Sequence, residues 1–409
     1  MGEDVNGKKL ILFLLDGVRW DYLDPDYVNL PGLKGIMERG VHVESLIPEF
    51  PSVSYPNHYS LMTGLHAQDH GFVDNDMYDV ETGKTYPPDS GSEDDKSFWF
   101  NEAEPFWITA KKQGKSVFMY NWVGGDVKIQ NERPNHFRPY STVKKIKYFR
   151  HDIDDGLQAL LNGLYHEGID DLGHRYGPKS PEVTEWLKNV DLEFSRLTQK
   201  LEDFGATDDV NIMIFSDHGM TDVSLSRVIN VTSVLPMENI KHVINGYGSR
   251  ISIWPKDGFE DEIYRLLKNY DRHMRVFLKE DIPVEWYYTN NSRIAPLLLV
   301  ADIGWYIDTP DFGFYHYDTG IMKGEHGYDP KLKEMHGIFI ATGPNFAVNY
   351  RSASIRNIDL YQIMCLITGV EALDNNGTWS NVGMFVSGSG LNSASFLVIL
   401  LIVFIANIL

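Results

Sequence analysis

The chain is poor in cysteine and in basic residues, and both shortages exclude whole classes of protein. Cys365 is the only cysteine among 409 residues, which excludes an internal disulfide and a zinc site built from several thiolates. Lysine and arginine total 37 against 57 acidic residues, which gives a formal net charge of −20. Such a chain would repel the phosphates of a nucleic-acid polymer, so we exclude nucleic acid as a partner. The acidic excess is compatible with a site in which metal ions neutralise clustered carboxylates.

Long apolar runs are also scarce. The N-terminal residues show no secretory apolar segment. The run from Phe396 to Ala406 is shorter than the ~20 residues of a spanning helix, and small residues precede it at 387–389. We therefore predict that residues 387–409 form a hydrophobic membrane-anchor signal of the glycosylphosphatidylinositol (GPI) type, with a tail-anchor helix as the alternative. The chain would then lie on the extracellular face of the plasma membrane, in agreement with glycosylation sequons at Asn230, Asn290 and Asn376.

Four short apolar runs are typical of buried strands. They are KKLILFLLDG (8–17), SVFMYNW (116–122), VNIMIFSDHG (210–219) and HGIFIATGP (336–344). Between them, apolar side chains at three-four spacing over 184–205 predict a long helix that ends at Gly205. The alternation predicts an α/β domain over 1–386, with a mainly parallel central sheet and helices on both faces. We interpret the aromatic-rich residues at roughly 245–318 as a small insertion on this domain.

Aspartate and histidine residues gather beside glycines and at the ends of the predicted strands. They are Asp16, Asp170, His174, Asp217, His218 and His326. Each alone is a weak signal, because an Asp at a strand end is often a helix cap and a single His is commonly structural. Together they provide three ligands for each of two metal ions, and this mixture suits Zn²⁺, with Mn²⁺ as a competitor. Two such ions would hold the attacking and departing oxygens of a phosphoryl transfer.

The stretch FPSVSYPNHYSLMTG (50–64) places Ser54 on a stiff bend. By itself, such a serine is usually a turn former or a helix cap. Beside the metal ligands, Ser54 is a candidate nucleophile and a seventh ligand, because a bound cation lowers the pKa of a hydroxyl group enough for attack.

These motifs resemble those of the ectonucleotide pyrophosphatase/phosphodiesterases of the alkaline phosphatase superfamily. The resemblance runs from Lys9 to about Val386 and rests on LLDGVRWDYL, SYPNHYSLMTGLHAQDHGFVDNDMYD, DDLGHRYGP, FSDHGMTD and EHGYD. It implies an alkaline-phosphatase-like fold with two zinc ions per chain, one held by Asp16, Ser54, Asp217 and His218 and the other by Asp170, His174 and His326. It also implies that Asn75 contacts a phosphate oxygen, a role that suits a neutral amide donor. His336 competes with His326, but only His326 matches the family's His-Gly-Tyr motif.

The motifs also bear on the substrate. Relatives that cleave nucleotides usually carry Thr in place of Ser54 and Pro in place of Ile169. Both departures look more like the choline-specific glycerophosphodiester phosphodiesterases of this family. The resemblance therefore implies hydrolysis of choline phosphodiesters, such as glycerophosphocholine or the lysolipid lysophosphatidylcholine, to phosphocholine. Choline recognition needs aromatic faces and a carboxylate, and we assign these to Tyr120, Trp122, Asp126 and Tyr165.

Several alternatives stay open. The stretches VDNDMYD and DVKI resemble dinucleotide-cleaving members and favour a nucleotide pyrophosphatase/phosphodiesterase. The four residues assigned to choline recognition are equally compatible with an ordinary core. A catalytically silent cell-surface protein would normally lose ligands or the nucleophile, and all seven residues are present here. The sequence does not decide whether the chain forms a homodimer.

Overall fold

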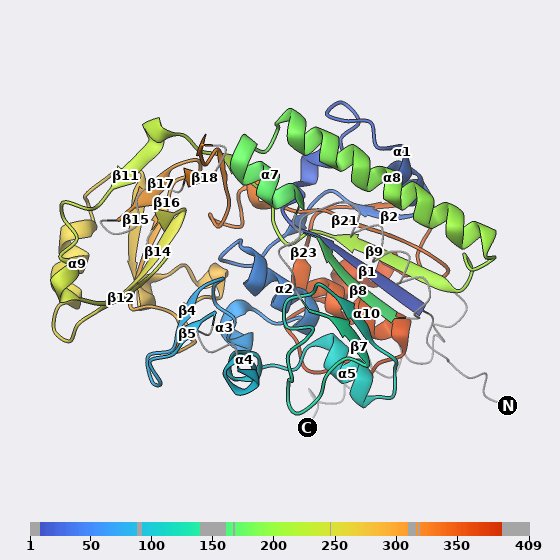
Figure 1. The fold of residues 1–409 in the computed structure, drawn as a ribbon, viewed down its shortest axis with the longest axis horizontal. Helices are drawn as coiled ribbons and strands as arrows, with labels where there is room; N and C mark the ends of the chain where they lie inside the picture. Colours follow the sequence, from blue (N-terminus) through green and yellow to red (C-terminus); the bar gives the residue numbers. More distant parts are fainter. Residues whose placement is uncertain are drawn as a thin grey trace, which may run out of the picture.

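The computed structural model describes residues 9–87, 92–139, 161–166, 168–245, 247–309, 316–317 and 320–386. They form a large central sheet covered by helices and a smaller lobe built around two further sheets (Figure 1).

The central sheet has eight strands, and most of its pairings are parallel. In spatial order the strands are β22 (Tyr350–Ser352), β2 (Gly40–Val43), β21 (Phe339–Thr342), β9 (Val210–Phe215), β1 (Lys9–Leu15), β8 (Leu161–His166), β6 (Phe118–Tyr120) and β7 (His136–Arg138). The antiparallel pairings are the two that β21 makes, with β2 and with β9. The other neighbours run parallel, including β1 with β8 and β1 with β9. The predicted mainly parallel sheet is confirmed.

The side chains of β1 alternate between two cores, because successive residues of a strand point to opposite faces. Leu10, Leu12 and Leu14 pack with helices α2 (Ser54–Thr63), α5 (Phe106–Lys112) and α10 (Leu360–Thr368). Ile11, Phe13 and Leu15 pack with α1 (Pro31–Glu38) and α8 (Pro181–Asp203) on the other face. Figure 1 shows α1 and α8 above the sheet and α5 and α10 below it. Helices therefore cover both faces, as the sequence predicts.

The long helix α8 begins three residues before the predicted range and ends, as predicted, just before Gly205. The hydroxyl of Ser180 accepts a hydrogen bond from the N–H of Val183, and Pro181 occupies the first turn, where its missing N–H costs little. The helix ends at Asp203, and Gly205 follows with a φ of +63°, the left-handed conformation that terminates many helices.

The smaller lobe lies beside the central sheet and has a core of its own. One of its sheets contains β12 (Ile240–Ile244), β14 (Arg250–Pro255), β16 (Leu297–Ala301) and β15 (Met274–Leu278), all antiparallel. The other contains β11 (Val228–Asn230), β17 (Tyr306–Asp308) and β13 (Tyr247–Gly248), and α9 (Glu260–Leu267) packs beside β15. This lobe occupies the place of the predicted insertion, and two of its strands, β11 and β12, precede residue 245.

The remaining α-helices and strands are short. They are α3 (Ala67–His70), α4 (Glu93–Phe100), α7 (Gly168–Tyr176), α11 (Trp379–Val382), β3 (Leu46–Ile47), β4 (Met77–Tyr78), β5 (Thr85–Tyr86), β10 (Thr221–Asp222), β18 (His316–Tyr317), β19 (Gly320–Ile321), β20 (Gly324–Glu325) and β23 (Ile355–Arg356). Among the described residues, no helix has the length and apolarity needed to cross a bilayer. The anchor signal at 387–409 lies outside the described residues, so anchoring stays a prediction.

Candidate metal centre and active site

A first group of candidate ligands lies at the carboxyl ends of β1 and β9. Asp16 follows β1 directly, and Asp217 and His218 come shortly after the end of β9. The two strands are adjacent and parallel, so their carboxyl ends meet at the edge of the sheet where ligands usually bind. All three residues are buried. His218 Nε2 lies 3.3 Å from Asp16 Oδ1 and 3.6 Å from Asp217 Oδ2.

A second group is built on α7, the helix that follows β8. Asp170 and His174 are four residues apart on this helix, which places both side chains on one face. His326 joins them from the residue after β20. The Nε2 atoms of His174 and His326 are each 3.5 Å from an oxygen of Asp170, and they are 3.1 Å from each other.

The two groups lie against each other. The rings of His218 and His326 stack with their centroids 3.7 Å apart. Gly17, with a φ of +69°, permits the end of β1 to approach α7, because a Cβ there would lie 2.9 Å from the Cα of Asp170. A larger residue at this position would push α7 away and separate Asp170 from Asp16. The structure thus brings all six predicted metal ligands together.

All three histidines direct the same ring nitrogen at the cluster. Nδ1 of His174, His218 and His326 lies 2.8, 2.8 and 3.0 Å from the backbone carbonyl oxygens of Gly324, Gly219 and Ser52, respectively. A carbonyl oxygen can only accept, so Nδ1 carries the donated proton and Nε2 is the nitrogen available to a cation. Mixed carboxylate and imidazole donors of this kind fit Zn²⁺.

The charges of the cluster also favour a cation. Burial alone would lower the pKa of His218, but the carboxylates of Asp217 and Asp16 outweigh it and raise the pKa to about 10, so a metal ion at Nε2 would displace a proton that these carboxylates attract. Burial raises the pKa of Asp170 to about 7, since the attraction of His174 does not offset the loss of solvent. Asp170 Oδ1 is buried and accepts no hydrogen bond from the described residues. The cluster therefore has more negative charge than its own side chains compensate, and a divalent ion would neutralise it.

Ser54 is the first residue of α2 and lies at the edge of the first group. Its Oγ is 3.3 Å from His218 Nε2, and the residue is 7% exposed, so the hydroxyl is close to the ligands and partly accessible. The preceding Val53 has extended backbone, which starts the helix at the serine. The positive end of the α2 dipole favours an alkoxide or a phosphate oxygen at this position.

Asn75 lies beside the start of α2. Its Oδ1 accepts a hydrogen bond of 2.8 Å from the N–H of Tyr55, so the amide nitrogen is the end that remains for donation. The backbone N–H of Asn75 donates to Asp74 Oδ1 at 2.7 Å. This orientation is compatible with the predicted contact between Asn75 and a phosphate oxygen.

Two further histidines differ in their position relative to the cluster. His336 lies apart from the cluster, where Nδ1 contacts the Ser45 hydroxyl at 2.8 Å and Nε2 contacts the carbonyl of Pro330 at 3.0 Å. His58, which the sequence analysis does not assign to the site, lies within it, because its Nε2 is 2.8 Å from Asp217 Oδ2. A hydrogen bond of this kind orients a ligating carboxylate. The sequence feature that could have identified His58 is its spacing, because it follows Ser54 by four residues on α2.

Among the side chains that the structure describes, those predicted to bind choline do not form a cage. Trp122 is 1% exposed, and its ring packs edge-on against Trp107 and Phe215 in the core, so it has no face for a ligand cation. The guanidinium of Arg138 lies 5.3 Å from the ring centroid of Tyr120, and Asp126 pairs with Lys96 at 3.8 Å. Tyr165 is in β8, but its side chain lies outside the described part of the chain. Trp122 is therefore a core residue, because burial removes the open ring face that choline needs.

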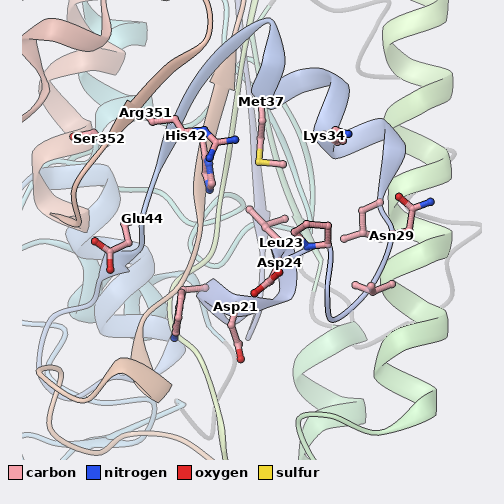
Figure 2. Close-up of a pocket in the computed structure, with 14 residues that line it drawn as sticks. Asp21, Leu23, Asp24, Asn29, Lys34, Met37, His42, Glu44, Arg351 and Ser352 are labelled. Carbon is pink, nitrogen blue, oxygen red and sulfur yellow. The ribbon is translucent and has the colours of Figure 1, made fainter.

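A cavity of about 410 Å³ lies away from the metal-ligand cluster (Figure 2). Its walls come from residues 20–30, α1, β2 and β22, and its lining includes neither Ser54 nor any of the six candidate ligands. Two of its acidic residues are neutralised, since Asp21 pairs with Arg19 and Glu44 pairs with Lys333. The cluster, rather than this cavity, is therefore the candidate substrate site.

Comparison with known proteins agrees with this geometry. The family described as type I phosphodiesterase/nucleotide pyrophosphatase matches residues 10–329. Ectonucleotide pyrophosphatase/phosphodiesterase family member 5 of Homo sapiens is 36% identical over 385 residues, which cover 92% of this chain and 77% of that protein. Bis(5'-adenosyl)-triphosphatase enpp4 of Xenopus laevis is 39% identical over 391 residues, which cover 93% of this chain and 82% of that protein.

Solved structures of ectonucleotide pyrophosphatase/phosphodiesterase 5 are also similar to this chain. An inactive variant of murine ectonucleotide pyrophosphatase/phosphodiesterase 5 in complex with AMP superposes with a TM-score of 0.85 at 36% identity, covering 93% of this chain and 100% of that chain. The human protein of the same name also superposes with a TM-score of 0.85, at 35% identity. These relatives are family members 5 and 4, so the finer resemblance to a choline-specific member is not supported. The alkaline-phosphatase-like fold is confirmed, and the chain belongs to the type I phosphodiesterase/nucleotide pyrophosphatase family.

Proposed function

We propose that the chain is a zinc-dependent hydrolase of nucleotide phosphodiester and pyrophosphate bonds, with Ser54 as the nucleophile. The observation that carries the proposal is the position of Ser54 Oγ at the head of α2, in contact with His218 of the ligand cluster. The similarity to a bis(5'-adenosyl)-triphosphatase and to a protein solved with AMP supports a nucleotide substrate. Nucleotides therefore replace choline phosphodiesters as the preferred substrate class.

The candidate ligands divide into two sets. Asp16, Ser54, Asp217 and His218 would hold one zinc ion, and Asp170, His174 and His326 would hold the other. Bound zinc would lower the pKa of the Ser54 hydroxyl and neutralise charge on the attacking and departing oxygens.

The protein's own residues account for the bond changes and for orientation. Ser54 Oγ releases its proton to solvent and attacks phosphorus, the bond from phosphorus to the leaving oxygen breaks with its electron pair on that oxygen, and a phosphate ester of Ser54 forms. Water then attacks the same phosphorus, the bond to Ser54 breaks, Ser54 Oγ regains a proton from that water, and the phosphorylated product leaves. Asn75 donates from its amide nitrogen to a phosphate oxygen, where a neutral donor stabilises developing charge.

Tyr55 offers a surface for a nucleobase. It directly follows Ser54, and its half-buried ring is supported edge-on by Phe72 and Tyr86. A supported aromatic ring next to the nucleophile would stack on a base, a contact that is worth about 1–3 kcal/mol per base in other proteins. No comparable role is needed for a substrate without a ring.

The test compares substrates on zinc-loaded protein. We expect bis(5'-adenosyl) triphosphate and the p-nitrophenyl ester of thymidine monophosphate to have kcat/KM values at least about tenfold above those of p-nitrophenyl phosphorylcholine and glycerophosphocholine. Tyr55→Leu should raise KM for the nucleotide esters, whereas the control Tyr270→Leu, on the smaller lobe, should not. A higher kcat/KM for the choline esters would overturn the nucleotide assignment. The absence of turnover with all four compounds would favour the silent binding protein.

A further inference from the structure

Arg250 of the smaller lobe forms a two-point ion pair with the residue that precedes Asn75. Arg250 lies at the start of β14 and is 6% exposed, and Asp74 is 3% exposed. Arg250 Nε donates to Asp74 Oδ2 at 3.2 Å, and Nη2 donates to Asp74 Oδ1. Asn245 adds a donor from the same lobe at 2.9 Å from Asp74 Oδ2. The carboxylate of Asp74 is therefore held from the lobe on both oxygens.

The same arginine packs against the turn that carries His326. Gly327 has a φ of +92°, and a Cβ there would lie 2.5 Å from Arg250 Nη1 and 2.6 Å from Ser249 Oγ. The guanidinium group is thus enclosed between the Asp74 carboxylate and the backbone after His326. This enclosure fixes its plane and leaves little freedom for Asp74 to move.

We propose that Arg250 is a positioning residue for the hydrolytic reaction, because it sets the orientation of Asn75 through Asp74. The inference rests on the proposed function. Asp74 Oδ1 accepts the backbone N–H of Asn75, and Asn75 Oδ1 accepts the N–H of Tyr55. These two bonds fix the backbone and the amide oxygen of Asn75, so the amide nitrogen has one direction in which to donate. The smaller lobe therefore contributes to the active site although neither Arg250 nor Asp74 contacts the nucleophile.

Lysine cannot replace Arg250 in this role. A planar guanidinium group binds both oxygens of a carboxylate, whereas an ammonium group is a point charge that binds without fixing the plane. Arg250→Lys keeps the charge that compensates Asp74 but loses the two-point geometry. It is therefore the variant that separates orientation from charge balance.

The experiment is a double-mutant cycle on zinc-loaded protein. For each variant, calorimetry measures the binding of inorganic phosphate, and enzyme kinetics measure kcat and KM for the p-nitrophenyl ester of thymidine monophosphate. We expect Arg250→Lys and Asn75→Ala each to weaken phosphate binding by about tenfold, and the double variant to be within about twofold of Asn75→Ala. Arg250→Lys should lower kcat by about tenfold or more while KM for the ester changes less than about threefold. Zinc content should stay at the wild-type value. Arg275→Lys, an exposed arginine of the same sheet, is the matched control and should leave all values unchanged.

Additive losses in the double variant, or wild-type phosphate binding by Arg250→Lys, would overturn the inference. If Arg250→Lys does not fold, Asp74→Asn takes its place in the cycle with the same expected result. If the wild-type protein hydrolyses no nucleotide ester, the proposed function fails, and the cycle on phosphate binding still decides the role of Arg250.

Discussion

Ser54 is the residue on which the proposed chemistry depends most directly. Ser54→Ala removes the atom that attacks phosphorus, so turnover should fall by about a thousandfold or more. Three ligands of the same group, Asp16, Asp217 and His218, remain, so the protein should still fold and bind metal. Turnover and elemental analysis on one preparation check both points. Ser60→Ala, on the same helix but directed at His70, should stay active. Activity near wild type in metal-loaded Ser54→Ala would refute the nucleophile assignment.

His70 makes stability depend on pH. Its Nδ1 accepts the N–H of Phe72, and burial lowers its pKa to about 3, well below the ~6.5 of an unfolded chain. Between these values the unfolded chain binds a proton that the folded chain does not. The free energy of unfolding should therefore fall as pH decreases below about 6.5, by at most ~1.4 kcal/mol per pH unit from this group.

Urea unfolding of chelator-treated protein at several pH values between about 7.5 and 5 checks this expectation. His70→Gln has no proton to gain, so its curve of unfolding free energy against pH should be flatter than that of the wild type. Parallel curves for the two proteins would show that His70 is not the group responsible.

At the scale of elements, α1 depends on a cap from another helix. Its own preceding residue, Leu30, provides no side-chain acceptor. Asp191 of α8 caps the helix instead. Its two carboxylate oxygens accept the N–H of Gly32 at 3.1 Å and the N–H of Leu33 at 2.7 Å. Asp191→Ala would leave two buried N–H groups without a partner and should cost about 2–3 kcal/mol.

Chemical denaturation of Asp191→Ala measures this loss. Glu185→Ala, an exposed position on the same helix, should change the free energy of unfolding by less than about 0.5 kcal/mol. If the two variants are equally stable, α1 is held by its apolar face alone.

The strands and the ligands at their ends were predictable because both depend on local pattern. The apolar runs that end at Asp16 and at Ser216–Asp217 predict strands, and parallel strands bring their carboxyl ends together. Contacts between distant residues were not predictable. His58 meets Asp217 across 159 positions and Arg250 meets Asp74 across 176, and no periodicity reports such pairs. Trp122 shows the same limit, because an aromatic residue after a strand has the same local pattern in a core and in a cage.

At the scale of the molecule, the segment that carries Asn75 links the smaller lobe to α2, because Asp74 pairs with Arg250 and Asn75 accepts the N–H of Tyr55. Besides Arg250, the lobe supplies Tyr288, whose hydroxyl donates to the carbonyl of Val73 at 2.9 Å. The central sheet supplies Asp16 and Asp217 from its strand ends. Under the proposed function, turnover therefore depends on the lobe staying docked against residues 73–75.

Metal binding should stabilise the whole molecule. The carboxylates of Asp16, Asp170 and Asp217 lie in one cluster, and their mutual repulsion is relieved by a cation that the unfolded chain binds less well. An ion at a hundred times its dissociation constant adds about 2.7 kcal/mol to the free energy of unfolding. Chelation should therefore lower the midpoint of thermal unfolding, and about two equivalents of zinc should restore it.

The number of zinc ions bound per chain decides whether His326 or His336 is a metal ligand. His326→Ala should bind about one equivalent of zinc fewer than the wild type, because it removes a ligand that lies 3.5 Å from Asp170. His336→Ala should bind as much zinc as the wild type, since its ring is occupied by Ser45 and Pro330. Elemental analysis after dialysis measures both. If His336→Ala loses an equivalent of zinc and His326→Ala does not, His336 is the ligand and His326 is not. If a single equivalent of zinc fully restores the thermal midpoint of the chelated wild type, the cluster holds one metal ion rather than two.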